Sequence, residues 1–151
     1  METLRSGKSI GWTHMKEVND EALVTSLAGM GSIAPLTAEK EKMFEQLGLR
    51  DRKAKRPLVE AVRVLEEHLQ KSVDVIVPAE LGGGNTAIPL DTAAQLGKII
   101  VDGGYAGRAI PEIEQCAPAM AHKEVTPIAC VDDWGKICYD DCERNERVDC
   151  R

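Results

Sequence analysis

The stretch SVDVIVPAELGGGNTAIPLDTAAQLGKIIVD, residues 72–102, decides the fold of this chain. It opens with a run of mainly β-branched residues, Val73–Val77, of the kind found in buried strands. Three glycines, Gly82–Gly84, then lead into a segment with helical spacing that stops at Gly97. A second apolar run follows directly and closes on Asp102. Strand, glycine turn, helix and strand in this order predict a βαβ unit, and hence a parallel sheet.

The segments before this unit extend the same pattern. The mostly apolar run at 22–28 predicts a further buried strand. Thr37 is placed to cap a short amphipathic helix that ends at Gly48. Pro57 suits the first turn of a longer helix that reaches Gln70.

The residues after Asp102 are rich in glycine and predict a functional loop followed by a short helix. The run TPIACVDDWGKICYDD, residues 126–141, predicts a hairpin in which Cys130 lies opposite Cys138 and Gly135 takes the left-handed position. We therefore expect a single α/β domain over residues 1–151. It would contain Rossmann-like βαβ units, a mainly parallel sheet and a C-terminal β-hairpin.

Composition limits the classes of partner. The chain has 151 residues and a net charge of −6, so it lacks the positive field that non-specific nucleic-acid binding requires. No apolar run approaches the roughly 18 residues that span a bilayer, and the first twelve residues do not resemble a signal peptide. We expect a cytoplasmic protein that binds neither nucleic acid nor membrane.

Five cysteines lie near the end of the chain, at positions 116, 130, 138, 142 and 150. An odd count without a secretory signal predicts reduced thiols rather than a disulfide framework. A metal site that uses some of these with His122 is the alternative, although no Cys-x-x-Cys pair is present.

The glycine turn has two functional interpretations. Gly82-x-Gly84-x-x-Ala87, followed by Asp102 at the end of the next strand, satisfies the permissive dinucleotide-binding fingerprint. However, the four residues 78–81 separate the strand from the first glycine, whereas the fingerprint begins at the strand end. A P-loop is excluded because no Gly-Lys-Ser/Thr follows the glycines.

The second interpretation is a small-molecule site at the carboxyl ends of the strands, where ligands bind in open α/β sheets. Amides at the start of the helix after the glycines, which Asn85 or Thr86 would cap, would bind an anionic or carbonyl oxygen. Arg108 would clamp a carboxylate, while Glu80 or Asp102 would act as a base or bind a metal. A purely structural alternative has both acids capping loops and Arg108 paired with Glu112.

Several motifs in residues 22–141 resemble the N-terminal domain of the S-methyl-thiohydantoin desulfurase-like proteins, a family associated with hydantoinase and oxoprolinase genes. The likeness rests on the strand that ends in Gly-Met-Gly, on PAELGGGN, on AAQLGKIIVD and on GRAIPE. It implies hydrolysis of a small cyclic amide or thiohydantoin. A divalent metal is compatible with that chemistry but is not required by the sequence. The motif positions carried over are Glu80, Gly82, Gly83, Asn85, Asp102, Gly107, Arg108, Pro111 and Glu112.

From these observations we assign catalytic roles to Glu80, Asp102, Arg108 and Glu112, and ligand binding to Gly82, Gly83, Gly84, Asn85, Gly103 and Gly104. Members of the family are longer, with a glycine-rich turn near the N-terminus and a second domain after the hairpin. We expect this chain to lack both. It would therefore form a homo-oligomer or work with a partner subunit that supplies the second domain, either as an enzyme or as a non-catalytic subunit. The second acid that the family loop carries two residues after Asp102 is replaced here by Gly104.

Overall fold

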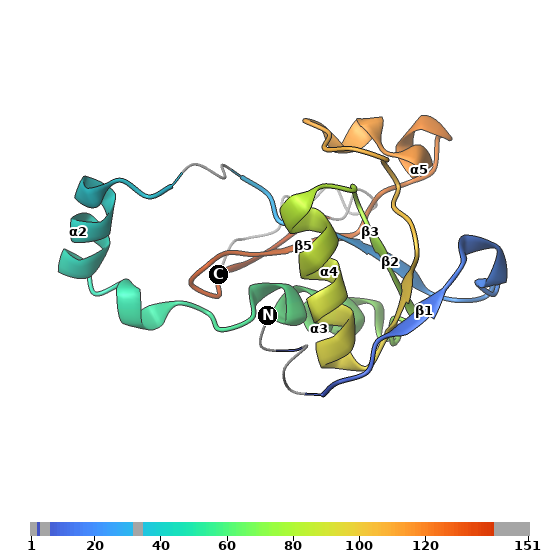
Figure 1. The fold of residues 1–151 in the computed structure, drawn as a ribbon, viewed down its shortest axis with the longest axis horizontal. Helices are drawn as coiled ribbons and strands as arrows, with labels where there is room; N and C mark the ends of the chain where they lie inside the picture. Colours follow the sequence, from blue (N-terminus) through green and yellow to red (C-terminus); the bar gives the residue numbers. More distant parts are fainter. Residues whose placement is uncertain (1–2, 4–6, 32–34, 141–151) are drawn as a thin grey trace.

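The computed structural model describes residue 3, residues 7–31 and residues 35–140 (Figure 1). A four-stranded sheet, in the order β1-β4-β3-β2, lies at its centre, and every neighbouring pair of strands is parallel. The strands are β1 (Gly11–Thr13), β2 (Val24–Leu27), β3 (Val75–Pro78) and β4 (Ile99–Val101). The predicted α/β class and parallel sheet are confirmed.

The edge strand β1 was not predicted. It is only three residues long, and its Trp12 is 56% exposed, so it leaves no apolar run in the sequence. Because β1 and β2 lie at opposite edges, the link between them crosses one face of the sheet through a short 3-10 helix, η1 (Met15–Glu17). Val18 and Ala22 from this link pack on the strands there.

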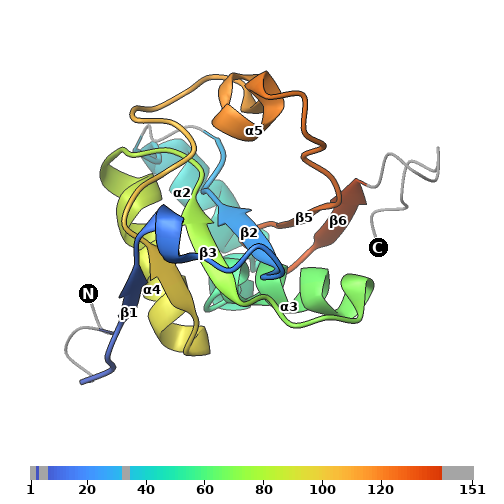
Figure 2. The ribbon, with the colours of Figure 1, turned by 90° about the vertical axis from the view of Figure 1, so that its right-hand side faces the viewer.

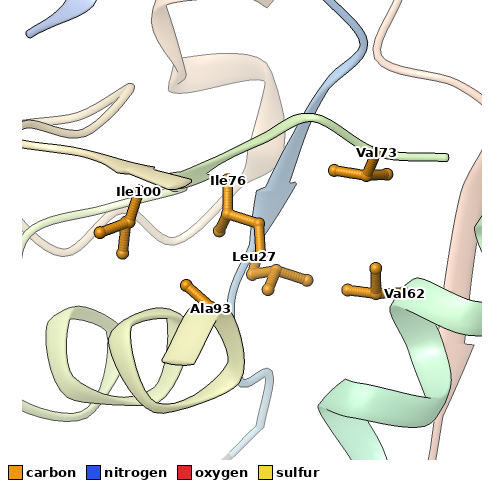
Figure 3. Packing of buried hydrophobic residues seen from close by; sticks show 6 residues of the cluster. All are labelled: Leu27, Val62, Val73, Ile76, Ala93 and Ile100. Carbon is orange, nitrogen blue, oxygen red and sulfur yellow. The ribbon is translucent and has the colours of Figure 1, made fainter. Parts of the chain in front are cut away.

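Two helices, α3 (Pro57–Leu69) and α4 (Gly83–Leu96), cover the opposite face. Pro57 occupies the first turn of α3, as predicted. Figure 3 shows Val62 of α3 and Ala93 of α4 directed at buried residues of the sheet. These side chains together form the main core. That core consists of Leu27, Val62, Val73, Ile76, Ala93 and Ile100.

Helix α4 begins earlier than the sequence suggested. Its N-cap is Gly82, so Asn85 and Thr86 lie inside the first turn, and the prediction that one of them is the N-cap is wrong. The Thr86 Oγ1 instead accepts a hydrogen bond from the amide of Gly82, the N-cap residue itself (3.1 Å). Pro89 consequently falls within the helix, where its side chain is buried.

Helix α2 (Ala38–Gln46) stands apart from the sheet (Figure 1). Thr37 caps it as predicted, accepting from the Lys40 amide (3.3 Å). The helix has no buried residue. It contacts the remainder of the structure through an edge-to-face ring pair between Phe44 and Trp134, whose centroids are 5.6 Å apart. A 3-10 turn, η2 (Arg50–Arg52), then leads toward α3.

The C-terminal hairpin consists of β5 (Ile128–Val131) and β6 (Ile137–Asp140). Its predicted register is confirmed, with Cys130 opposite Cys138 and Gly135 at a φ of 82°. The hairpin packs against α3, where the Tyr139 hydroxyl donates to the Val64 carbonyl (3.4 Å). Between sheet and hairpin lie η3 (Ile113–Gln115) and the short helix α5 (Ala117–Met120), as expected.

The cysteines differ from the expectation. Cys138 is disulfide-bonded, so the prediction of reduced thiols is wrong at that position, whereas Cys116 and Cys130 are free. Positions 142 and 150 lie outside the described residues. Among the residues that the structure describes, no three His, Cys, Asp or Glu side chains come together to hold a metal ion. Within the same residues, no helix is long and apolar enough to cross a membrane.

Candidate functional site

Three loops meet at the carboxyl ends of the strands. They follow β2, β3 and β4, and the second of them feeds the N-terminus of α4 (Figure 2). Parallel strands bring their carboxyl ends to one edge, which is where open α/β sheets bind ligands. Side chains and backbone groups from all three loops hydrogen-bond to one another at this edge.

Asn85 joins the loop after β2 to the start of α4. Its Oδ1 accepts from the Gly29 amide (2.7 Å), and its Nδ2 donates to the Gly29 carbonyl (3.2 Å). The same Nδ2 donates to Glu80 Oε1 (2.6 Å). Asn85 therefore links the loop after β2 to the Glu80 carboxylate and to the first turn of α4.

Glu80 joins this group to the loop after β4. Its Oε2 accepts from the Ile110 amide (2.7 Å), so each carboxylate oxygen already has a donor. The hydrogen bonds from Ile110 and then Asn85 hold the pKa of the Glu80 carboxyl below its usual value, against a smaller opposing effect of burial. A carboxylate with a lowered pKa and two donors is a poor base, and this geometry favours a structural role for Glu80.

Backbone hydrogen bonds complete the attachment of the loop after β4. The Leu81 amide donates to the Ala106 carbonyl (2.9 Å), and the Tyr105 amide donates to the Pro78 carbonyl (3.1 Å). Tyr105 packs against the sheet face crossed by the β1–β2 link. Burial, and secondarily the neighbouring Cys116, raises the pKa of its hydroxyl, so Tyr105 stays neutral.

Gly104 lies where this loop approaches β3 most closely. A Cβ added there would lie 3.1 Å from Leu81 Cγ and 3.2 Å from the Pro78 carbonyl oxygen. Both distances are shorter than ordinary van der Waals contacts. A side chain at this position would therefore require Leu81 or the Pro78 carbonyl to shift, and close packing favours glycine here.

The first turn of α4 presents backbone donors at the centre of the edge. The amides of Gly83, Gly84 and Asn85 precede the first intrahelical hydrogen bond, which the Thr86 amide donates to the Gly82 carbonyl (2.8 Å). Gly83 and Gly84 are exposed, and a Cβ added to Gly82 or Gly83 would meet nothing within 4 Å. Gly83 and Gly84 therefore lie at the surface, and the helix dipole makes the amides of this turn favourable for an electron-rich oxygen.

The other predicted residues are less tightly placed. Asp102 is exposed at the end of β4, and its amide donates to the Thr13 carbonyl (2.9 Å). Arg108 is exposed and donates to the Ala109 carbonyl (3.0 Å). Within the described part of the chain, no ion pair joins Arg108 to Glu112, and no hydrogen bond joins either of them or the Asp102 side chain to Glu80. Gly103 continues the turn after Asp102, where its amide donates to the Val101 carbonyl (3.0 Å).

Two residues of this arrangement were absent from the predicted site. Gly29 pairs with Asn85 through both its amide and its carbonyl, and Ile110 donates its amide to Glu80. The Gly-Met-Gly that ends the second strand was the available signal for Gly29. Ile110 contributes only its backbone, for which the side-chain pattern carries no signal.

Comparison with known proteins bears on this arrangement. No significant match was found among the curated proteins or the solved structures. The family model described as the S-Me-THD-like, N-terminal domain matches residues 1–139, which include every residue of the site described above. This chain therefore belongs to the family of S-Me-THD-like N-terminal domains.

Proposed function

We propose that this domain binds a small cyclic amide of the hydantoin or thiohydantoin class at the carboxyl edge of its sheet, in the manner of a hydrolase. The observation that carries the proposal is the set of open amides in the first turn of α4, held in a frame that Asn85 and Glu80 fasten. The family assignment supports this ligand class.

The chemistry follows from the donors. A ring carbonyl oxygen that accepts from the amides of Gly83 and Gly84 is polarised, and the same amides stabilise the negative charge that develops when water attacks. Because both oxygens of Glu80 are occupied, we assign the base to Asp102, whose carboxylate is exposed at the end of β4. Arg108 and Glu112 remain proposed contributors, and turnover would call for a second domain or subunit.

Dinucleotide binding is the second candidate. Asp102 favours it, because the dinucleotide-binding fingerprint has an acid at the end of the strand that follows the glycine turn. Here that strand is β4, which pairs with β3, and Asp102 follows it directly. The geometry at Ala87 opposes it: this residue is exposed, whereas the third small residue of the fingerprint serves close packing of helix on strand. Gly82 also follows Leu81 and not the end of β3, so the turn begins beyond the strand.

A pair of substitutions at one position tests the amide cradle. Gly83→Pro removes a single N–H at a helix position where proline is tolerated, and the extended Gly82 (φ −164°, ψ 162°) suits a residue that precedes proline. Gly83→Ala keeps the N–H and adds a methyl group into open space. Affinity for hydantoin and 2-thiohydantoin would be measured by isothermal titration calorimetry.

Wild type and Gly83→Ala should bind a cyclic amide with equal affinity. Gly83→Pro should bind it about tenfold more weakly, because one hydrogen bond to the ligand is lost. The Gly83→Pro variant must keep the wild-type circular dichroism. Binding of NAD but of no cyclic amide would refute the proposal, as would equal affinities of the proline and alanine variants. Any hydrolysis should fall with Asp102→Asn and survive Asp20→Asn, which changes an exposed acid before β2.

A further inference from the structure

A cleft of about 450 Å³ lies between α4 and the segment that enters α3. On the α4 side it is lined by Ile88, Asp91 and Gln95, which are three and four residues apart and therefore share one face of the helix. Lys55 and Arg56 line it from the other segment. Ligand pockets typically have volumes of about 300–1,000 Å³, so this cleft can hold a small molecule.

The cleft carries two positive charges that no acid neutralises in the part of the chain that the structure describes. Lys55 and Arg56 are exposed, and neither forms an ion pair there. Arg50 and Lys53, from the same basic run, each pair with an acid. Arg56 is the N-cap residue of α3, but its side chain makes no capping hydrogen bond. Both cations can therefore donate to a carboxylate of a ligand.

Asp91 supplies the opposite charge on the α4 side of the cleft. Its Oδ1 accepts from the Thr3 hydroxyl, and its Oδ2 accepts from Gln95 Nε2 (3.5 Å). Among the described residues, no ion pair joins Asp91 to a base. Neutral donors leave the negative charge of the carboxylate in place, so this side of the cleft favours a cation.

A second acceptor on the same side lacks a donor. Gln95 Nε2 donates to Thr3 Oγ1 (2.7 Å), whereas Gln95 Oε1 is buried and accepts no hydrogen bond from the described residues. A buried acceptor without a donor is destabilising, and such groups are rare in native structures. A ligand that brings an N–H donor to this side of the cleft would satisfy the oxygen.

We propose that this cleft binds a free α-amino acid with an apolar side chain. The carboxylate of the ligand accepts from Lys55 and Arg56, and its ammonium group lies at Asp91 and donates to Gln95 Oε1. The apolar side chain covers Ile88, which is 36% exposed. A simple anion would be repelled by Asp91 and a simple amine by the two cations, whereas a zwitterion matches both signs. The amides of Gly83 and Gly84 take no part, so neither this site nor the proposed function depends on the other.

An NMR titration that follows the backbone amides of the full chain tests the proposal with four probes. L-leucine carries all three groups, 4-methylpentanoate lacks the ammonium group, 3-methylbutylamine lacks the carboxylate, and free glycine lacks the apolar side chain. L-leucine should shift the amides of Arg56, Asp91 and Gln95. It should bind at least about tenfold more tightly than each of the other three, because each of them loses a charge-assisted hydrogen bond or an apolar contact.

Substitutions locate the contacts. Arg56→Gln and Asp91→Asn should each weaken L-leucine binding about tenfold and keep the wild-type circular dichroism. Arg52→Gln is the matched control, because Arg52 is an exposed base of the same run that does not line the cleft, and it should bind L-leucine like wild type. The proposal is wrong if L-leucine leaves these amides unshifted, if any of the other probes binds as tightly, or if the Arg52 and Arg56 variants bind equally. None of these outcomes bears on the binding of hydantoins.

Discussion

Replacing Glu66 by Gln should destabilise the fold measurably at neutral pH. Glu66 Oε1 accepts three hydrogen bonds, from the Val73 amide (2.8 Å), Lys98 Nζ (2.9 Å) and Ser72 Oγ (3.1 Å). These bonds tie the end of α3 to the chain entering β3 and to the turn before β4. The Lys98 and Glu66 side chains are only 17% and 22% exposed, so solvent screens the pair incompletely.

The magnitude follows from the loss of charge. A glutamine oxygen still accepts hydrogen bonds, but a bond to a charged group contributes about 1 kcal/mol more than a neutral one. With three donors on one oxygen and partial exposure, we expect a loss of about 2 kcal/mol in the free energy of unfolding. For a chain of this size that corresponds to a melting temperature lower by roughly 4–8 °C.

The effect should depend on pH. Burial by itself would raise the pKa of Glu66, but the hydrogen bonds from Lys98, Val73 and Ser72, with the charge of Lys98, outweigh it and hold the pKa below the usual value of 4.5. A carboxyl group whose pKa is lowered by folding contributes stability above the unfolded pKa and loses it as the pH falls through the folded pKa. The difference between wild type and Glu66→Gln should therefore be constant from pH 6 to 8 and shrink below about pH 4.5.

Urea denaturation followed by tryptophan fluorescence would measure both quantities. Glu67→Gln is the matched control, because this neighbouring acid on α3 is exposed, and it should be neutral within about 0.5 kcal/mol. If the Glu66 and Glu67 variants unfold at the same urea concentration at pH 7, the network does not stabilise the fold. A difference that persists unchanged at pH 3 would refute the electrostatic explanation.

Three further predictions concern the core and the site. Gly104→Ala should cost about 1–3 kcal/mol through overpacking, whereas Gly107→Ala, with nothing within 4 Å of the added methyl, should be near neutral; thermal melts of the pair decide this. Val62→Ala removes a fully buried side chain and should cost about 2 kcal/mol in a urea titration, so a change below about 0.5 kcal/mol would contradict the packing shown in Figure 3. Asn85→Ala should speed hydrogen exchange at the Gly29 amide at least tenfold without altering exchange in α3, and an unchanged rate would rule out Asn85 as the link to the loop after β2.

Local patterns predicted much of this fold because the elements concerned depend on near neighbours. The run at 73–77, the cap at Thr37 and the proline that begins α3 each satisfy a short-range requirement, and all three were found close to where they were expected. The hairpin register followed from the position of Gly135 for the same reason.

The errors arose where distant residues compete for the same group. Asn85 is a good N-cap residue, but in the structure its amide is used by Gly29 and Glu80, which come from other loops. The helix is then free to start at Gly83. β1 was missed for a related reason, since three residues form a strand only because β4 lies beside them. The residues assigned to the candidate site lie at the carboxyl edge of the sheet, as the strand pattern indicates, but the contacts among them depend on such long-range hydrogen bonds.

The strand order also constrains how the protein is made. β1 has one neighbour in the sheet, β4, which is the last of the four strands to leave the ribosome. At ordinary rates of synthesis, Gly11–Thr13 must wait on the order of ten seconds for that partner. β2 and β3 can pair before then, so a nascent chain halted before Ile99 would contain the β2–β3 half of the sheet but have its first strand unpaired.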